Sequence, residues 1–227
     1  MPFVYIMPVK IGGTPHGALN KYRGIILKKF EDALASNRQL IFGVDEAGRG
    51  PLAGPVVAAA VFLRGSDIVG LDDSKKLSPH RRSILEQQIK EQCDWAVGIA
   101  SHDEIDEINI LQATMLAMKR AADALTQKID ALPDMILVDG NRLPKWRYGA
   151  QAIIGGDSLH PCISAASIIA KEHRDRLMME ADAQYPQYGW ATNKGYGSKA
   201  HLEAIAQYGP SPFHRMSFAP MRQMTLL

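Results

Sequence analysis

An acidic pair between two apolar runs constrains the fold of this chain more than any other feature of its sequence. The stretch LIFGVDEAGRGPLAGPVVAAAVF, residues 40–62, places Asp45 and Glu46 between a short apolar run and a Gly-Arg-Gly turn. The first run, residues 40–44, and the second, residues 55–63, have the apolar and β-branched composition of buried strands. We therefore expect two neighbouring antiparallel strands, with two carboxylates where the first strand ends.

The rest of the sequence alternates between strand and helix patterns. Apolar runs predict further strands at residues 94–101 and 135–140, and a fifth strand that ends in AIIGGD at residue 157. Helical spacing predicts helices at residues 21–36, 79–89, 102–128, 163–183 and 198–207. Ser78 is the expected N-cap of the second helix, with Pro79 at its first position. The first three strands are close in sequence, whereas the later two follow a long helix. This order indicates an α/β fold with a central mixed five-stranded sheet flanked by helices.

Composition excludes several classes of protein. With 46% hydrophobic and 22% charged residues in 227, the chain can bury a core without metal or disulfide support. Cys93 and Cys162 lie in apolar surroundings and are expected to be reduced thiols, which fits a cytoplasmic location. No apolar run approaches the roughly 18 residues that span a membrane. The N-terminal segment also lacks the basic start of a signal peptide.

Charge is distributed unevenly along the chain. Residues 1–42 carry six Lys or Arg against two Asp or Glu, and residues 186–227 carry four against one. Since the net charge of the whole chain is only +2, the central part is acidic. This pattern is compatible with a metal site beside a groove for a polyanion. Uneven surface charge without function is an equally good interpretation of this observation alone.

Acidic residues follow the predicted strands at three places. Asp45 and Glu46 follow the first strand, Asp139 follows the fourth and Asp157 ends the fifth. If these strands are parallel and adjacent, their carboxyl ends form one site with four carboxylates. Like charges at about 4 Å repel by roughly 1 kcal/mol even in water, and hard cations such as Mg²⁺ or Mn²⁺ relieve that repulsion. The pattern thus predicts two-metal phosphoryl chemistry. Taken singly, Asp139 could be a turn residue and Asp157 a helix N-cap.

From DEAGRGPLAGPVVAAAV onward the chain closely resembles ribonuclease HII. The resemblance continues through DDSKKLS, IDEINILQATMLAM, LVDGN, GGDSLHPCISAASIIAKEHRD, YPQYGWATNKGYGSKAH and HRMSF, over roughly residues 39–220. It implies a ribonuclease H-like fold with a helical C-terminal extension. The domains would be an N-terminal extension, flexible or partly helical, at residues 1–38, a catalytic domain at residues 39–185, and a substrate-binding extension at residues 186–227 packed on that domain.

The resemblance also implies an activity and a cofactor. The enzyme would hydrolyse the RNA strand of RNA–DNA hybrids and incise 5′ to single ribonucleotides in duplex DNA, leaving 3′-hydroxyl and 5′-phosphate ends. It would use Mn²⁺ or Mg²⁺ at a two-metal site. The catalytic and metal-binding residues of the family fall on Asp45, Glu46, Asp139 and Asp157. These are the same four residues that the strand ends predict.

Further residues are implied to bind the substrate. The turn Gly48-Arg49-Gly50 would meet the ribonucleotide 2′-hydroxyl, and Tyr196 would stack on the sugar 3′ to it. Phosphate contacts are expected from a lysine pair and, more weakly, from four other side chains: Lys75, Lys76, Lys171, Arg174, His214 and Arg215. His214 is also a candidate proton shuttle. Taken without the resemblance, the turn, the tyrosine and the lysine pair could equally be ordinary surface features.

Some features depart from the family or leave alternatives open. Met216 stands where the family often has Arg, so a basic contact is expected to be missing there, and residues 1–38 have no counterpart. The alternatives are ribonuclease HIII, a hybrid-binding module without catalysis, and a phosphohydrolase of small substrates. Expected partners are RNA–DNA hybrids and ribonucleotide-containing duplex DNA. We expect a monomer that binds no membrane. The sequence identifies no replication or repair partner.

Overall fold

A computed structural model describes residues 39–224. The extension at residues 1–38 and the helix predicted at residues 21–36 lie outside this range. Leu40 begins one compact unit that includes the C-terminal segment. Its elements, in chain order, are β1 Ile41–Ala47, β2 Val56–Phe62, α2 Pro79–Gln92, β3 Asp94–Ala100, α3 His102–Ile129, β4 Met135–Asp139, β5 Ala150–Ile153, η1 Gly156–Ser158, α4 Pro161–Gln184, η2 Pro186–Tyr188, α5 Trp190–Asn193, α6 Lys199–Tyr208 and α7 Ala219–Met224.

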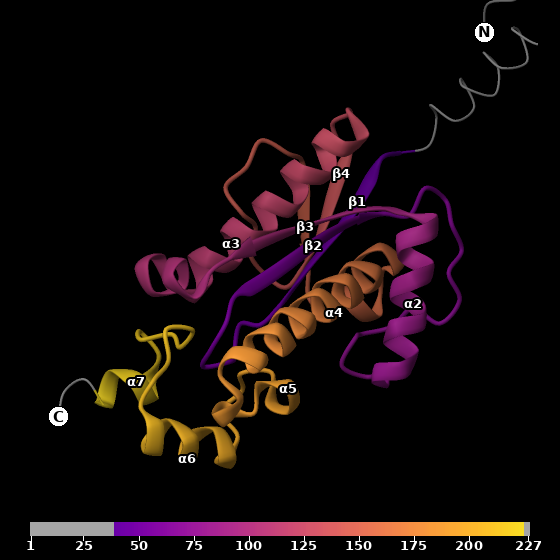
Figure 1. Ribbon diagram of the computed structural model, residues 1–227. Helices are drawn as coiled ribbons and strands as arrows, with labels where there is room; N and C mark the ends of the chain where they lie inside the picture. Colours follow the sequence, from indigo (N-terminus) through magenta and orange to yellow (C-terminus); the bar gives the residue numbers. More distant parts are fainter. Residues whose placement is uncertain (1–38, 225–227) are drawn as a thin grey trace, which may run out of the picture. The chain divides into compact units, whose positions relative to one another are not determined.

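The five strands form one mixed sheet in the order β3-β2-β1-β4-β5, which confirms the predicted fold class (Figure 1). β1 pairs antiparallel with β2, and β2 pairs antiparallel with β3. β4 is parallel to both β1 and β5. α3 provides the crossover from β3 to β4, whereas a loop joins β4 to β5. The carboxyl ends of β1, β4 and β5 therefore meet at one edge of the sheet.

Helices cover both faces of the sheet, with α3 on one face and α4 and α2 on the other (Figure 1). Alternate side chains of β2 point to opposite faces of the sheet, and both sets are buried. Val56, Ala58 and Ala60 pack with α3, whereas Ala59 and Val61 pack with α2 and α4. Small residues at these positions let the helices approach the sheet closely. No helix within residues 39–224 is long and apolar enough to cross a membrane.

Capping residues fix where the long helices begin. Ser78 caps α2 by accepting a hydrogen bond from the backbone N–H of Arg81, as the sequence predicts. Ser101 and Glu104 form a capping box at the start of α3. Asn109, with φ of 67°, interrupts α3 near its start, and its side-chain oxygen accepts hydrogen bonds from the next turn.

The contact between β1 and α4 depends on Gly43. A Cβ atom at this position would lie 2.2 Å from the carbonyl carbon of Cys162 and 2.3 Å from its oxygen. The first turn of α4 therefore packs directly on the β1 backbone. This close contact places the residues just before α4 beside the carboxyl end of β1.

Gly43→Ala is expected to lower the free energy of unfolding by roughly 1–3 kcal/mol, because backbone atoms on both elements must separate. Urea denaturation of the full chain measures this loss. Gly149→Ala is a matched control, since its Cβ would come no nearer than 3.7 Å to the carbonyl oxygen of Asp134. Equal stability of the two variants would contradict the packing argument.

The C-terminal segment packs on the turn between β1 and β2. Trp190, Ile205 and Met221 form a third apolar cluster with Ala53 from that turn and Met178 from α4. The backbone confirms the contact, because the N–H of Leu52 donates to the carbonyl of Gly195 at 2.7 Å. Residues more than a hundred positions away in the chain thus pack against the turn after the acidic pair and fix its position.

Candidate active site

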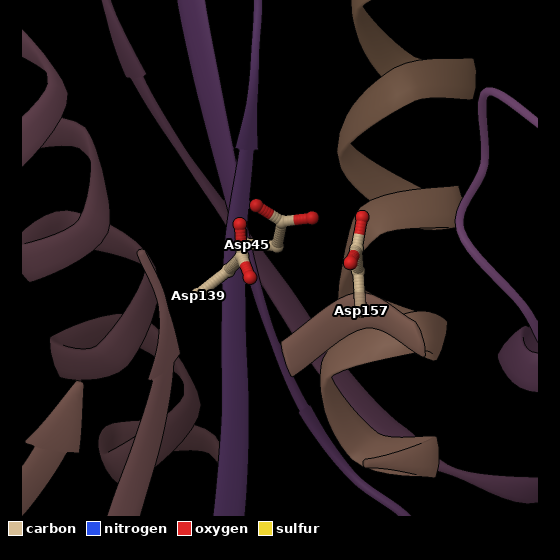
Figure 2. A group of neighbouring side chains, drawn as sticks. All are labelled: Asp45, Asp139 and Asp157. Carbon is tan, nitrogen blue, oxygen red and sulfur yellow. The ribbon is translucent and has the colours of Figure 1, made fainter. Parts of the chain in front are cut away.

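Three aspartates converge at the carboxyl ends of the parallel strands. Asp45 lies in β1, Asp139 ends β4 and Asp157 lies in η1, just before α4. One carboxylate oxygen from each lies within 4.8 Å of the others, and Figure 2 shows the three side chains pointing toward one another. The register pairs Val44 with Val138, which places Asp45 and Asp139 side by side.

Asp157 reaches the site by a different route from the one predicted. β5 ends at Ile153, so Asp157 does not end a strand. Gly155, with φ of 67°, turns the chain into η1, and the backbone N–H of Gly156 donates to Oδ1 of Asp139 at 2.8 Å. This hydrogen bond joins the turn to the end of β4 and holds Asp157 opposite the other two carboxylates.

Glu46 lies outside this group of three. The expectation that β1 ends at the acidic pair is wrong, because the strand continues to Ala47 and pairs Glu46 with Ala58. Consecutive residues of a strand face opposite sides of the sheet, so Asp45 faces α4 while Glu46 faces α3. The Glu46 carboxylate accepts a hydrogen bond of 3.4 Å from Nη1 of Arg49. It still interacts electrostatically with Asp45 and Asp139.

The converging carboxylates repel one another. Burial raises the pKa of Asp45 well above its usual range, and the charges of Glu46, Asp139 and Asp157 raise it further. Burial also raises the pKa values of Glu46 and Asp157. Within the described residues the converging group consists of carboxylates, without imidazole or thiol. Such an all-oxygen donor set suits Mg²⁺ or Mn²⁺.

The loop that follows β2 supplies two further groups, one of which sequence reasoning missed. Asp73 lies against Asp157 and raises the pKa of that carboxyl. Lys75 faces the acids: burial acts to lower the pKa of its ammonium, but Asp73, Asp45 and Asp157 raise it overall. Nζ of Lys76 instead donates to Oγ of Ser158 at 2.8 Å, which ties the loop to η1. The motif DDSKKLS showed acids and lysines together, but not which of them face the site.

Arg215 holds the Gly-Arg-Gly turn from inside the protein. Its guanidinium is fully buried and donates to four backbone carbonyls, those of Gly48, Arg49, Gly54 and Pro55, at 2.6–3.2 Å. Burial, and then the like charge of Arg174, lowers the pKa of Arg215 to about 9, so that it remains charged at neutral pH. The predicted phosphate contact is therefore wrong for Arg215, because its donors are occupied by the turn.

Arg174 of α4 also binds backbone carbonyls of the turn. It is 1% exposed and donates to the carbonyls of Ala53, Pro55 and Lys194. It thereby joins the turn after β1 to the segment that carries the predicted tyrosine. Although Arg174 also lines the cleft beside the acids, three of its N–H groups are used in these backbone contacts. A Cβ at position 48, where Gly48 has φ of 99°, would lie 2.1 Å from Nε of Arg174. Glycine is required there for both reasons.

Tyr196 lies at the mouth of a cleft beside the acids. The cleft encloses about 290 Å³ and is lined by Asp45, Glu46, the Gly-Arg-Gly turn, Lys75, Lys171 and Tyr196. The Tyr196 ring is 47% exposed, and its Cε1 lies 3.5 Å from the position of a Cβ on Gly50. Lys171 lines the same cleft, but its ammonium is paired with Asp175 at 2.6 Å. The cleft joins the turn, the acids and the tyrosine.

His214 is buried in a network that excludes it from the site. Its Nδ1 accepts from the backbone N–H of Ser211, and its Nε2 lies 3.1 Å from Nε2 of His201. Trp190 also donates to that His201 nitrogen. Burial lowers the pKa of His214 to about 4, so the ring is neutral at neutral pH. Neither of the roles predicted from the sequence fits a neutral ring that is 1% exposed.

Met216 lies at the surface of the C-terminal segment. Its side chain is partly exposed, and its backbone N–H donates to Oδ2 of Asp106 at 2.7 Å. The next residue, Ser217, donates to the same carboxylate. The turn is thus fixed by backbone contacts that do not depend on the side chain at position 216.

The family model and the similar proteins that the comparisons find carry the same family description. Residues 42–221 match the family model described as Ribonuclease HII. Ribonuclease HII of Sphingopyxis alaskensis is 63% identical over 188 residues, which are 83% of this chain and 93% of that protein. Ribonuclease HII of Erythrobacter litoralis is 55% identical over 204 residues, which are 86% of this chain and 96% of that protein.

Solved structures share the fold. The RNase HII of Archaeoglobus fulgidus, solved in a complex with PCNA, superimposes with a TM-score of 0.63 at 27% identity, over 79% of this chain and 95% of that one. Bst-RNase HIII in complex with Mn²⁺ has a TM-score of 0.67 at 21% identity, over 85% of this chain and 71% of that one. The second likeness concerns the fold alone.

Proposed function

This chain belongs to the ribonuclease HII family, and on that premise we propose that it incises duplex DNA 5′ to a single embedded ribonucleotide. Family membership makes it a ribonuclease H, a hydrolase that cleaves the RNA strand of RNA–DNA hybrids. The observation that supports the finer proposal is the convergence of three carboxylates within 4.8 Å, in a cleft walled by the Gly-Arg-Gly turn and Tyr196.

We assign the chemistry to the acidic residues. Asp45, Asp139 and Asp157 would hold divalent cations, with Glu46 as a further ligand from the opposite face of β1. Two bound Mg²⁺ or Mn²⁺ ions would supply water activation and stabilisation of the leaving oxygen, which gives 3′-hydroxyl and 5′-phosphate ends. Lys75 faces the same carboxylates and is placed to contact the phosphate being cleaved. Lys171 and Lys76 are weaker candidates, because both ammonium groups already have partners.

Specificity would come from the turn and the tyrosine acting together. Backbone groups of Gly48, Arg49 and Gly50 would contact the 2′-hydroxyl, which is the group that distinguishes RNA from DNA. Tyr196 adjoins Gly50, so its ring would pack on the next sugar, where a 2′-hydroxyl would be disfavoured. The pair would therefore select an RNA-to-DNA junction.

A cleavage assay with three duplexes tests the proposal. The substrates are a DNA duplex with one ribonucleotide, the same duplex without it, and an RNA–DNA hybrid, each with Mg²⁺ or Mn²⁺. We expect incision 5′ to the single ribonucleotide, cleavage of the hybrid, and no cleavage of DNA. Cleavage limited to the hybrid would reject junction recognition, and no cleavage of either substrate would reject the proposed activity.

We further propose that the enzyme acts as a monomer in the cytoplasm and binds a protein of the replication machinery. The PCNA complex of the Archaeoglobus fulgidus RNase HII supports such a partner for this chain. Size-exclusion chromatography with light scattering measures the oligomeric state directly.

A further inference from the structure

A groove lies between α3 and the loop that follows β4. It encloses about 440 Å³. Its floor includes Ile108, Leu111 and Met115 of α3, and cations stand on its rim: Lys119, Arg142 and Lys145. None of the residues that line it is acidic. The assignments made so far give this groove no role.

The groove continues the surface of the active site. A hollow of about 250 Å³ has Glu46, Arg49 and Asp139 on its wall, and it shares Leu111, Met115 and Arg142 with the groove. The cleft that contains Tyr196 shares Glu46 and Arg49 with that hollow but shares no residue with the groove. A path from Tyr196 to the groove therefore passes over the acidic residues.

The charge of the rim is available to a ligand. Arg142 and Lys145 are exposed, and neither makes a hydrogen bond or an ion pair with any residue in the described part of the chain. Lys119 differs, because its ammonium is paired with Asp123 at 2.6 Å. Leu143, between the two unpaired cations, is 41% exposed. Two unpaired cations beside an apolar floor complement the phosphates and sugars of a nucleic-acid backbone.

We propose that this groove binds the arm of the duplex on the 5′ side of the ribonucleotide, with Arg142 and Lys145 on its phosphates. The assignment rests on the proposed function, in which Tyr196 takes the sugar on the 3′ side. The acidic residues lie between Tyr196 and the groove, so the groove receives the arm on the 5′ side of the ribonucleotide. These contacts are with the backbone, so they carry no sequence preference.

Substrates that differ in one arm test the assignment. We compare the parent enzyme with an Arg142→Ala/Lys145→Ala variant on duplexes that contain one ribonucleotide. The 5′ arm has about 4 or about 15 base pairs, at 3.4 Å per base pair, and the 3′ arm is long in both. The control is Lys90→Ala/Lys128→Ala, which removes the same number of exposed cations from the β3 edge, above Trp95. Unlike the groove cations, Lys90 is paired with Glu86 and Lys128 donates to the Trp95 carbonyl.

For the long 5′ arm, we expect the KM of the groove variant to rise by roughly 10-fold or more at low salt while kcat changes by less than about 2-fold. The slope of log KM against log salt should fall by about 2, one for each phosphate that no longer has a cation beside it. With the short arm, the groove variant and the parent should have nearly the same KM. The control variant should match the parent on both substrates.

Three outcomes would overturn the inference. These are an unchanged KM with the long arm, an equal loss for both lengths, and a loss that follows the length of the 3′ arm instead. Fluorescence anisotropy with the same duplexes separates this inference from the proposed function. If the parent cleaves neither duplex but binds the long 5′ arm more tightly than the variant does, the activity fails and the groove assignment stands. Equal binding by parent and variant would reject the groove.

Discussion

Asp45→Asn is expected to reduce cleavage by on the order of 10³-fold or more while substrate binding changes little. The amide keeps the shape of the side chain but removes the charge that would hold the cations, and losing one group that stabilises developing charge already costs about 10²–10³-fold. Single-turnover cleavage and anisotropy on the same duplex measure the two effects. Equal losses of binding and cleavage would contradict the metal role of Asp45.

The same variant should be more stable than the parent when metal is absent. Burial, with the charges of Glu46, Asp139 and Asp157, raises the pKa of Asp45, so the folded protein holds this proton to higher pH than the unfolded chain does. The metal-free parent therefore loses stability as pH rises from the unfolded pKa through the folded one, and Asn removes that loss. Mn²⁺ should raise the melting temperature of the parent but not of the variant.

Asp103→Asn provides the control for both effects, because this carboxylate on α3 is 84% exposed and lies outside the acidic group. It should leave cleavage, the melting temperature without metal and the Mn²⁺ response at parental values. A metal-free Asp45→Asn protein that melts below the parent would show that the carboxylate is stabilising, contrary to the direction of its pKa shift.

Arg215→Met is expected to lower the free energy of unfolding by more than about 4 kcal/mol, which is an exceptional loss for one residue. The substitution keeps an apolar stem but leaves the carbonyls of Gly48, Arg49 and Gly54 without this donor, at roughly 1–3 kcal/mol for each buried group. The carbonyl of Pro55 keeps its hydrogen bond from Arg174. Urea denaturation measures the loss. Arg147→Met, which removes an exposed guanidinium above Tyr148, should cost less than about 0.5 kcal/mol.

Arg215→Lys separates the geometry of the guanidinium from its charge. Lysine keeps the buried cation but cannot serve four carbonyls with one rigid fork, so the Gly-Arg-Gly turn should loosen. At a temperature where the variant remains folded, we expect cleavage at the single ribonucleotide to fall by about 10-fold or more. Parental cleavage by Arg215→Lys would show that the charge alone is sufficient and that the bonds to the turn are not required.

Much of the fold follows from local patterns. Apolar periodicity predicts the five strands and the long helices, and Ser78-Pro79 predicts where α2 begins. The long helix before β4 permits a crossover, so the order of the elements is compatible with β4 parallel to β1, whereas β5 follows β4 after a loop. The acidic character of the site is also evident from residue types alone.

The arrangement within the site is less predictable from local patterns. β1 continues past Asp45 and Glu46 because β2 pairs with it as far as Ala47, and that pairing puts the two carboxylates on opposite faces. Asp73 and Lys75 face the acids because the loop after β2 folds back over η1, to which Lys76 binds. These positions depend on contacts between segments that no spacing rule connects.

The sequence by itself determined the type of fold and the acidic residues, because strand periodicity, helix caps and residue chemistry are local properties. Only the tertiary structure decided which cations are buried and which are exposed. Arg215 and Gly48 are 167 residues apart in the chain, and their hydrogen bond buries a guanidinium that the sequence suggests is free for phosphate. Arg142 and Lys145, which no motif singled out, remain exposed, and no carboxylate is among the residues that line the groove with them. Whether a charged side chain is buried or paired depends on the packing of distant segments, so it does not follow from the residue's type.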